Sequence, residues 1–228
     1  MRIAEIFQSL QGEGRHTGVE SVFVRASGCN LRCWYCDTPY TSWAPEGDDY
    51  SVDEIVGQVE RYGAEHVVLT GGEPMLFAEL VPLTEQLRRL GKHITIETAG
   101  TLYLPVACDL MSISPKLANS TPSAERDARW AKRHERSRHV PEVIRRLTGE
   151  FPHQLKFVID SQDDLAEVEH YLAEFPEVRH RDVWLMPQGV DAYELAKRAE
   201  WLEPHCREHG YRFCPRRHIE WYGPVRGT

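Results

Sequence analysis

Short apolar runs alternate with amphipathic helical patterns along most of this 228-residue chain. Runs typical of strands lie at 21–27, 66–70, 93–98, 108–114, 153–160 and 182–187. Amphipathic stretches typical of helices lie at 51–63, 78–91, 161–175 and 191–210. This alternation predicts parallel strands joined by right-handed crossovers. About seven strands are too few for a closed eightfold barrel, so the predicted fold class is α/β, a partial (open) parallel β/α barrel.

The chain shows no internal repeat and no low-complexity stretch, so we predict a single domain over residues 1–228. Residues 118–149 break the strand–helix rhythm, because the segment "RDARWAKRHERSRHVPEVIRR" is locally basic and helical in pattern. We interpret it as a helical excursion facing solvent, with a partner-binding or lid surface as the alternative.

The formal net charge of −8 argues against non-specific nucleic-acid binding, which needs a basic surface. No apolar run approaches the length of a membrane span, and the N-terminus lacks the pattern of a secretory signal. We therefore expect a cytoplasmic protein, with no membrane and no nucleic-acid partner, in which the six cysteines are reduced. Such cysteines are metal ligands or core thiols more often than disulfides.

Short polar or glycine-containing motifs follow several of the predicted strands. They are "GCNLRC" after 21–27, "GGEP" after 66–70, "TAG" after 93–98, "SPK" after 108–114 and "PQG" after 182–187. In parallel barrels the loops at the carboxyl ends of the strands carry the chemistry. We therefore expect these five motifs to surround one site.

Three cysteines lie within eight positions, Cys29, Cys33 and Cys36, with C-x3-C-x2-C spacing. Cys214 and His218 could complete a zinc site, but structural zinc sites take four ligands and normally show two separated ligand pairs. Three close thiolates suit a 4Fe–4S cluster in which one iron keeps an open position for another ligand. The three other thiols fit no ligand pattern and are predicted core or surface thiols: Cys108, Cys206 and Cys214.

The triplet, with Tyr35 before its last cysteine, and "TGGEP" at 70–74 together resemble the radical S-adenosylmethionine superfamily. The resemblance implies that S-adenosylmethionine chelates the open iron and is cleaved by one electron from the cluster. Glycines at the strand end would allow its amino group to approach the backbone closely. The implied S-adenosylmethionine contacts are Tyr35, Gly71, Gly72, Glu73, Glu97, Ser114, Lys116 and Lys156.

The sequence around these two motifs indicates one family within the superfamily. The block "IFQSLQGEGRHTGVESVFVRASGCNLRCWYCDT" resembles the start of the 7-carboxy-7-deazaguanine synthase family, as do "ITIETAG", "SISPK", "LKFVID" and the late His218. That family converts 6-carboxy-5,6,7,8-tetrahydropterin to 7-carboxy-7-deazaguanine with loss of ammonia, in queuosine and deazapurine biosynthesis. The resemblance implies magnesium, a homodimer and an external electron donor of the flavodoxin type.

The resemblance also implies substrate contacts, each with a chemical reason. Arg25, a charge inside an apolar run, can bind the substrate carboxylate with two parallel hydrogen bonds. Glu13 can accept hydrogen bonds from a guanine-like edge, and the Thr38 hydroxyl can be an oxygen ligand of magnesium. The full implied substrate set is Gln11, Glu13, Arg25, Gln188 and His218. Related sequences carry threonine before the late histidine, where this chain has Arg217.

Two other functions remain open at this stage. A glycyl-radical activating enzyme would share the cysteine triplet and GGEP but act on a polypeptide, without need of the "QGEG" segment or Arg25. A non-catalytic iron–sulfur or metal-binding module is the second alternative, although an electron carrier normally supplies four cysteines to each cluster.

Overall fold

The computed structural model describes residues 1–228, and nine strands form one sheet in the order β3-β1-β2-β4-β5-β6-β7-β8-β9. The strands are β1 Arg2–Leu10, β2 Glu20–Ala26, β3 Asp48–Asp49, β4 His66–Gly71, β5 His93–Thr98, β6 Leu110–Ile113, β7 His153–Ile159, β8 Val183–Pro187 and β9 Arg212–Phe213. The α-helices are α1 Pro39–Ser42, α2 Val52–Tyr62, α3 Leu80–Arg89, α4 Ala124–Ser137, α5 Pro141–Glu150, α6 Asp164–Ala173, α7 Ala192–His209 and α8 Arg217–Tyr222. Single 3-10 turns lie at η1 Gly14–His16, η2 Pro74–Leu76, η3 Ala118–Ser120 and η4 His180–Asp182.

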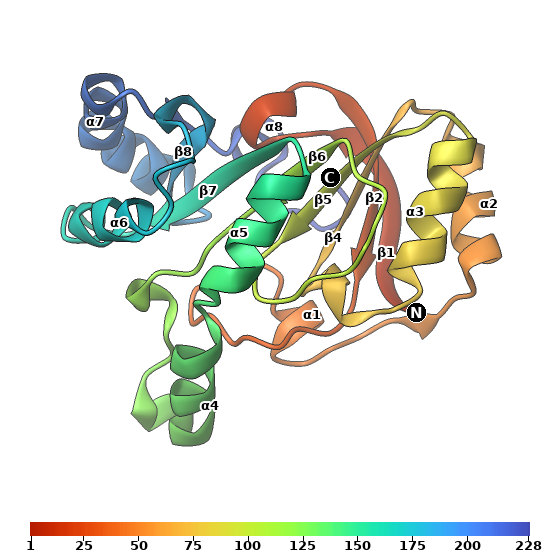
Figure 1. The fold of residues 1–228 in the computed structure, drawn as a ribbon, viewed down its shortest axis with the longest axis horizontal. Helices are drawn as coiled ribbons and strands as arrows, with labels where there is room; N and C mark the ends of the chain where they lie inside the picture. Colours follow the sequence, from red (N-terminus) through yellow and green to blue (C-terminus); the bar gives the residue numbers. More distant parts are fainter.

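All pairs from β2 to β9 are parallel, and the sheet curves without closing (Figure 1). The predicted partial β/α barrel is therefore confirmed. Three strands were not predicted, namely β1 and the two-residue strands β3 and β9. Of these, β1 precedes the first predicted strand and pairs antiparallel with β2. The expectation of purely parallel pairing thus fails at this edge. Antiparallel strands can be connected without a helix, so the strand–helix alternation used for the prediction does not detect them.

The two faces of the sheet differ because side chains alternate along each strand. On the outer face, residues such as Leu69, Ile96 and Phe157 are buried in a core cluster of 37 residues, together with apolar side chains of α2, α3, α5, α6 and α7. On the inner face the same strands carry polar residues, among them Thr70 and Glu97. The concave side is thus left open for a site.

The predicted helices begin and end where their signals lie. Ser51 caps α2 in a capping box with Glu54, and Gly63 ends that helix in the left-handed conformation. Pro82 sits in the first turn of α3, where it needs no backbone donor. None of the helices combines the length and apolar character that crossing a bilayer requires.

Residues 118–149 contain η3, α4 and most of α5, and the two α-helices differ in role. Ile144 and Leu147 of α5 are buried in the main core, so α5 covers the sheet. Only α4 projects from the body (Figure 1). It is tied to the cysteine loop by His134, whose Nδ1 accepts from the Arg32 backbone at 3.0 Å and whose Nε2 lies 2.8 Å from the Ser120 hydroxyl.

Candidate functional site

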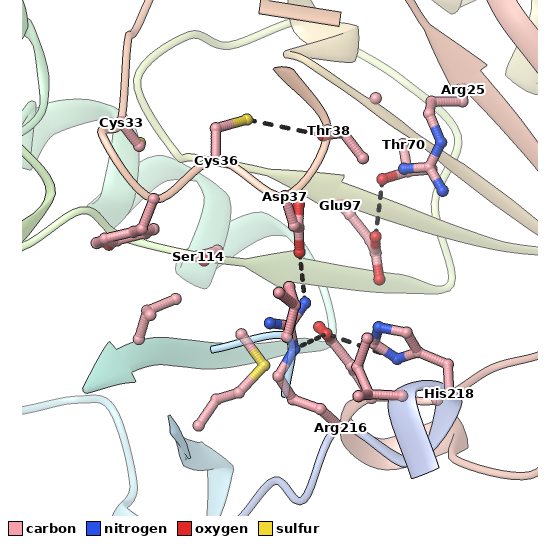
Figure 2. Close-up of a pocket in the computed structure, with 18 of the residues that line it drawn as sticks. Arg25, Cys33, Cys36, Asp37, Thr38, Thr70, Glu97, Ser114, Arg216 and His218 are labelled. Carbon is pink, nitrogen blue, oxygen red and sulfur yellow. Dashed lines mark hydrogen bonds and ion pairs between the residues drawn. The ribbon is translucent and has the colours of Figure 1, made fainter. Parts of the chain in front are cut away.

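The inner face of the sheet lines a cavity of about 350 Å³, within the size range of small-molecule sites. Strand residues and the cysteine loop line it (Figure 2). The C-terminal segment 223–228 also contributes lining residues. The five strand-end motifs predicted to surround one site all contribute lining residues: Cys29, Gly71, Ala99, Ser114 and Gln188 are examples.

The cysteine loop follows β2 and places Cys29, Cys33 and Cys36 in the cavity lining. Burial raises the pKa of Cys29 and of Cys33 to about 12, so bare thiolates are unfavourable there. A cationic metal centre removes that cost by taking the thiolates as ligands. Three soft sulfur donors on one short loop fit an iron–sulfur cluster, and the loop brings no fourth.

Gly71 and Gly72, at the end of β4, pack directly against the backbone where the cysteine loop begins. The Gly71 φ is +133°, and a Cβ there would lie 2.1 Å from the Ala26 carbonyl oxygen. A Cβ on Gly72 would lie 2.2 Å from the Gly28 carbonyl oxygen. Only glycine permits this approach, so the pair fixes the position of the cysteine loop against the sheet.

Glu73, a predicted S-adenosylmethionine contact, has its side chain outside the cavity lining. That side chain is fully buried. The carboxylate accepts hydrogen bonds from the Thr98 hydroxyl at 2.8 Å and the Ala99 and Met75 backbones at 2.8 and 3.1 Å. Burial raises its pKa even against these bonds. Glu73 therefore ties the β4 and β5 loops together, and its side chain cannot reach a ligand in the cavity.

Glu13 lies at the centre of a charged network. It pairs with Lys156, lies 3.1 Å from the Arg216 Nε, and is 3.9 Å from the His218 Nδ1. Burial alone would raise the Glu13 pKa, but Lys156, Arg216 and His218 together hold it far below its usual range. Glu13 is consequently ionised, and the segment 11–14 places it in the cavity lining.

Arg216 is the main residue that the sequence analysis missed. It is 5% exposed, its guanidinium bridges Glu13 and Asp37, and it is the one non-glycine residue with positive φ, at 56°. Its neighbour Arg217, which attracted notice in the sequence, instead pairs with Glu220 at the surface. Two adjacent arginines before His218 were the only signal available.

Arg25, a predicted substrate contact, projects from β2 into the cavity (Figure 2). Its Nε donates to Glu5 at 2.6 Å, and its guanidinium carbon lies 5.6 Å from the centre of the Phe7 ring. Burial lowers the Arg25 pKa, but Tyr40 and Glu5 raise it by more. Glu5 thus orients the guanidinium by one nitrogen and leaves its terminal nitrogens facing the cavity.

Comparison with known proteins agrees with this geometry. Residues 23–159 match the family model for the radical SAM superfamily. The 7-carboxy-7-deazaguanine synthase of Rhodopirellula baltica is 47% identical over 99% of this chain and 88% of its own length. This chain belongs to that family. The Halobacterium salinarum synthase is 46% identical over 95% of this chain and 88% of its own length.

The crystal structure of QueE from Escherichia coli superimposes with a TM-score of 0.70 at 26% identity, covering 93% of this chain and 92% of that one. Membership of the radical SAM family brings a 4Fe–4S cluster and S-adenosylmethionine as cofactors. In this chain, the cysteine triplet and the strand-end loops supply the groups in the cavity that can bind the cluster and S-adenosylmethionine.

The other predicted residues also line the cavity. Gln11 donates to Glu97 at 3.3 Å, and the Thr70 hydroxyl donates to the second Glu97 oxygen at 2.8 Å. The Lys116 ammonium donates to the Ser114 hydroxyl at 2.6 Å. Further lining positions are Tyr35, Thr38, Gln188 and His218.

Lys156 was predicted beside S-adenosylmethionine, yet its ammonium lies between Glu13 and Glu97, 3.9 Å from the latter. Its neighbourhood is that of the predicted substrate residues. The remaining thiols, Cys108, Cys206 and Cys214, are free and buried, and the first two belong to the main core cluster.

Proposed function

We propose that this protein converts 6-carboxy-5,6,7,8-tetrahydropterin to 7-carboxy-7-deazaguanine with loss of ammonia. The proposal rests on one observation above all: the cysteine triplet, Arg25 and the Glu13 network line the same cavity. When bound, the cluster and S-adenosylmethionine supply a hydrogen-abstracting radical next to the cysteine loop. The residues opposite that loop then have to hold a small, polar, anionic ring system.

In the proposed substrate pocket, different residues bind the two ends of the pterin. Arg25 offers its terminal guanidinium nitrogens to the carboxylate, a bidentate geometry that lysine cannot supply. Ionised Glu13 accepts hydrogen bonds from amino and ring N–H groups. Burial lowers the His218 pKa, so its imidazole is neutral at pH 7 and can donate one hydrogen bond and accept one.

Two further assignments follow from the placement of residues. Ser114 and Lys116, bonded to each other beside the cysteine loop, would hold the ribose and carboxylate of S-adenosylmethionine, with Tyr35, Gly71 and Gly72 at the same end. Gln11 and Thr70 fix the Glu97 carboxylate between the two ligand positions. Lys156 positions Glu13, and Gln188 lines the substrate side.

The function is tested by anaerobic reconstitution with iron and sulfide, followed by incubation with the pterin, a reductant and S-adenosylmethionine. We expect a deazapurine product while S-adenosylmethionine is regenerated. A variant with Cys29, Cys33 and Cys36 changed to alanine should lose both iron and turnover. The matched triple variant of Cys108, Cys206 and Cys214 should keep its iron. Modification of a polypeptide with no turnover of the pterin would favour a glycyl-radical activating enzyme instead.

Arg25→Lys should reduce kcat/KM by roughly 10- to 150-fold, corresponding to about 1.5–3 kcal/mol for a lost charge-assisted bond. Lysine keeps the charge but cannot bond Glu5 and the substrate carboxylate together. Steady-state kinetics of both proteins provide the measurement. Cleavage of S-adenosylmethionine in the absence of pterin should persist, and unchanged kcat/KM would remove Arg25 from the pocket.

We propose Thr38 as the ligand that this chain gives to magnesium. It precedes α1, lines the cavity, and its hydroxyl lies 3.8 Å from the Cys36 sulfur. Thr38→Val keeps the branched shape but removes the oxygen, so magnesium should stimulate turnover less and at higher concentration. Iron content is the control and should not change. The same magnesium dependence in both proteins would place the metal elsewhere.

We propose that the external electron donor docks on α4. The helix lies against the cysteine loop: Arg126 donates to the Trp34 carbonyl at 3.3 Å and stacks 3.9 Å from the Trp43 ring centre. Its exposed face carries Arg129, Lys132, Arg133 and Arg136. An acidic, flavodoxin-like donor complements this charge. Lys132→Glu/Arg136→Glu should slow turnover with flavodoxin but not with dithionite; equal slowing with both would contradict the docking site.

We also propose a cytoplasmic homodimer that forms one structural unit over residues 1–228 and has no nucleic-acid or membrane partner. Family membership supports the dimer, and the single hydrogen-bonded sheet supports one unit. Light scattering after size exclusion tests the dimer: a monomeric mass in active fractions would exclude it.

A further inference from the structure

We propose that His16, His66 and His93 form a binding site for a divalent transition metal of the zinc type, separate from the catalytic cavity. One ligand nitrogen from each of the three lies within 4.8 Å of the others. The ring centres are 4.4 Å apart for His66 and His93, 4.8 Å for His16 and His93, and 5.3 Å for His16 and His66. Three imidazoles are an established donor set for such metals.

The fold builds this cluster from three segments. His66 and His93 are the first residues of β4 and β5 and are direct partners in the parallel register, so the sheet fixes their spacing. His16 ends η1, which follows the "QGEG" segment. Three Zn–N bonds of about 2.0–2.1 Å put tetrahedral ligands roughly 3.3 Å apart. Closing from 4.8 Å requires the rings to move by about an ångström or more, which side-chain rotation can supply.

Without a ligand, two nitrogen atoms of the histidine cluster lack a hydrogen-bond partner. The Nδ1 atoms of His16 and His93 are buried and have no hydrogen-bond partner. Buried polar groups are normally bonded, and each exception asks for an explanation. No protein group competes for these two nitrogens, and all three side chains keep enough exposure for an ion to enter.

The protonation state also favours metal binding. Burial, then the neighbouring His93, His66 and Arg15, lowers the pKa of His16 to about 4. Burial and His93 lower the pKa of His66, against smaller opposing effects of Glu65 and Asp109. Neutral imidazole is the ligating form, so at neutral pH a metal does not have to displace protons from these two rings.

The cluster lies at the opposite end of the strands from the cysteine loop. His93 and Glu97 share one face of β5 and are four residues apart, or roughly 13 Å. The two sites are nonetheless linked, because His16 comes three residues after Glu13. A metal bound to all three histidines would fasten the segment that carries Gln11 and Glu13 to β4 and β5. Its expected role is therefore to stabilise the substrate-binding segment, with one coordination position left for water.

The test is a calorimetric titration with Zn²⁺ of the reconstituted enzyme, in which iron–sulfur occupies the loop cysteines. Wild type should bind one zinc per chain at this site, with micromolar or tighter affinity, and its thermal midpoint should rise. His66→Gln and His93→Gln should each weaken binding by at least about tenfold and abolish the rise. Their iron content and zinc-free midpoint report whether the fold is kept.

His205→Gln is the matched control. His205 stacks on His209 at 4.0 Å and has a buried Nε2 without a partner, so it resembles the cluster but offers only two imidazoles. This variant should bind zinc like wild type. The proposal is overturned if wild type takes up no zinc, if the His66 and His93 variants bind it unchanged, or if the loss occurs in His205→Gln instead.

Discussion

Arg216→Gln should lower the free energy of unfolding by roughly 3 kcal/mol and reduce kcat/KM on the order of 100-fold. The guanidinium bridges Glu13 and Asp37 while 5% exposed, so its removal leaves two carboxylates without their shared partner. Removing one member of a buried pair typically costs about 3–5 kcal/mol. The lower value applies because Glu13 keeps Lys156 and the Asp37 side chain is 45% exposed.

The adjacent arginine provides the control for this prediction. Arg217 is exposed and pairs with Glu220 within its own helix, so Arg217→Gln should change the free energy of unfolding by less than about 0.5 kcal/mol. Both variants lose one positive charge, and they differ only in burial and partners. Denaturant titration and steady-state kinetics of the two proteins decide the question. Equal effects would mean that net charge, and not the bridge to Glu13 and Asp37, matters.

The sequence was sufficient for what depends on local patterns. Strand runs, the Ser51 and Gly63 helix signals and the cysteine spacing are all local, and the structure contains the corresponding elements. β1 was overlooked because most residues of the segment "RIAEIFQSL" are only half-buried. Its register with β2 also shifts between Ile3 and Glu5, and such an irregularity interrupts the alternation of apolar and polar residues.

Long-range charge pairing could not be predicted in the same way. Arg216 and Glu13 are 203 positions apart, and the left-handed backbone at Arg216 has no signal in a non-glycine residue. Glu73 illustrates a second limit of local patterns. Its motif was recognised, but the direction of its side chain is decided by Thr98 and Ala99 on another strand. A motif thus indicates which residues gather at a site, while the tertiary contacts determine which of them face it.

Glu13→Gln should reduce kcat/KM on the order of 10³-fold, the largest effect expected of any single substitution here. The expected reduction in kcat/KM is the product of two separate effects. A charge-assisted hydrogen bond to the substrate is worth about 1.5–3 kcal/mol, and displacement of the ring by about 1 Å costs on the order of another 100-fold. Glutamine keeps the shape of the side chain but carries an amide N–H₂ where the substrate needs an acceptor.

A second substitution separates the catalytic role of Glu13 from its role in stability. Glu13→Gln leaves the buried Lys156 ammonium 3.9 Å from its remaining partner, Glu97. Lys156→Met in turn leaves Glu13 with Arg216 and His218. Each single variant should lose stability, because an ion is left without its closest counter-ion. In the double variant neither ion remains, so its loss should be smaller than the sum by about 1–3 kcal/mol.

Activity should behave differently from stability in this cycle. If Glu13 contacts the substrate, the double variant regains stability but keeps the low kcat/KM of Glu13→Gln. If Glu13 only neutralises Lys156, turnover returns together with stability. Denaturant midpoints and kinetics of wild type, both single variants and the double variant, all with equal iron content, distinguish the two cases. Recovery of turnover in the double variant would transfer substrate recognition from Glu13 to other hydrogen-bonding residues of the cavity, among them Gln11 and His218.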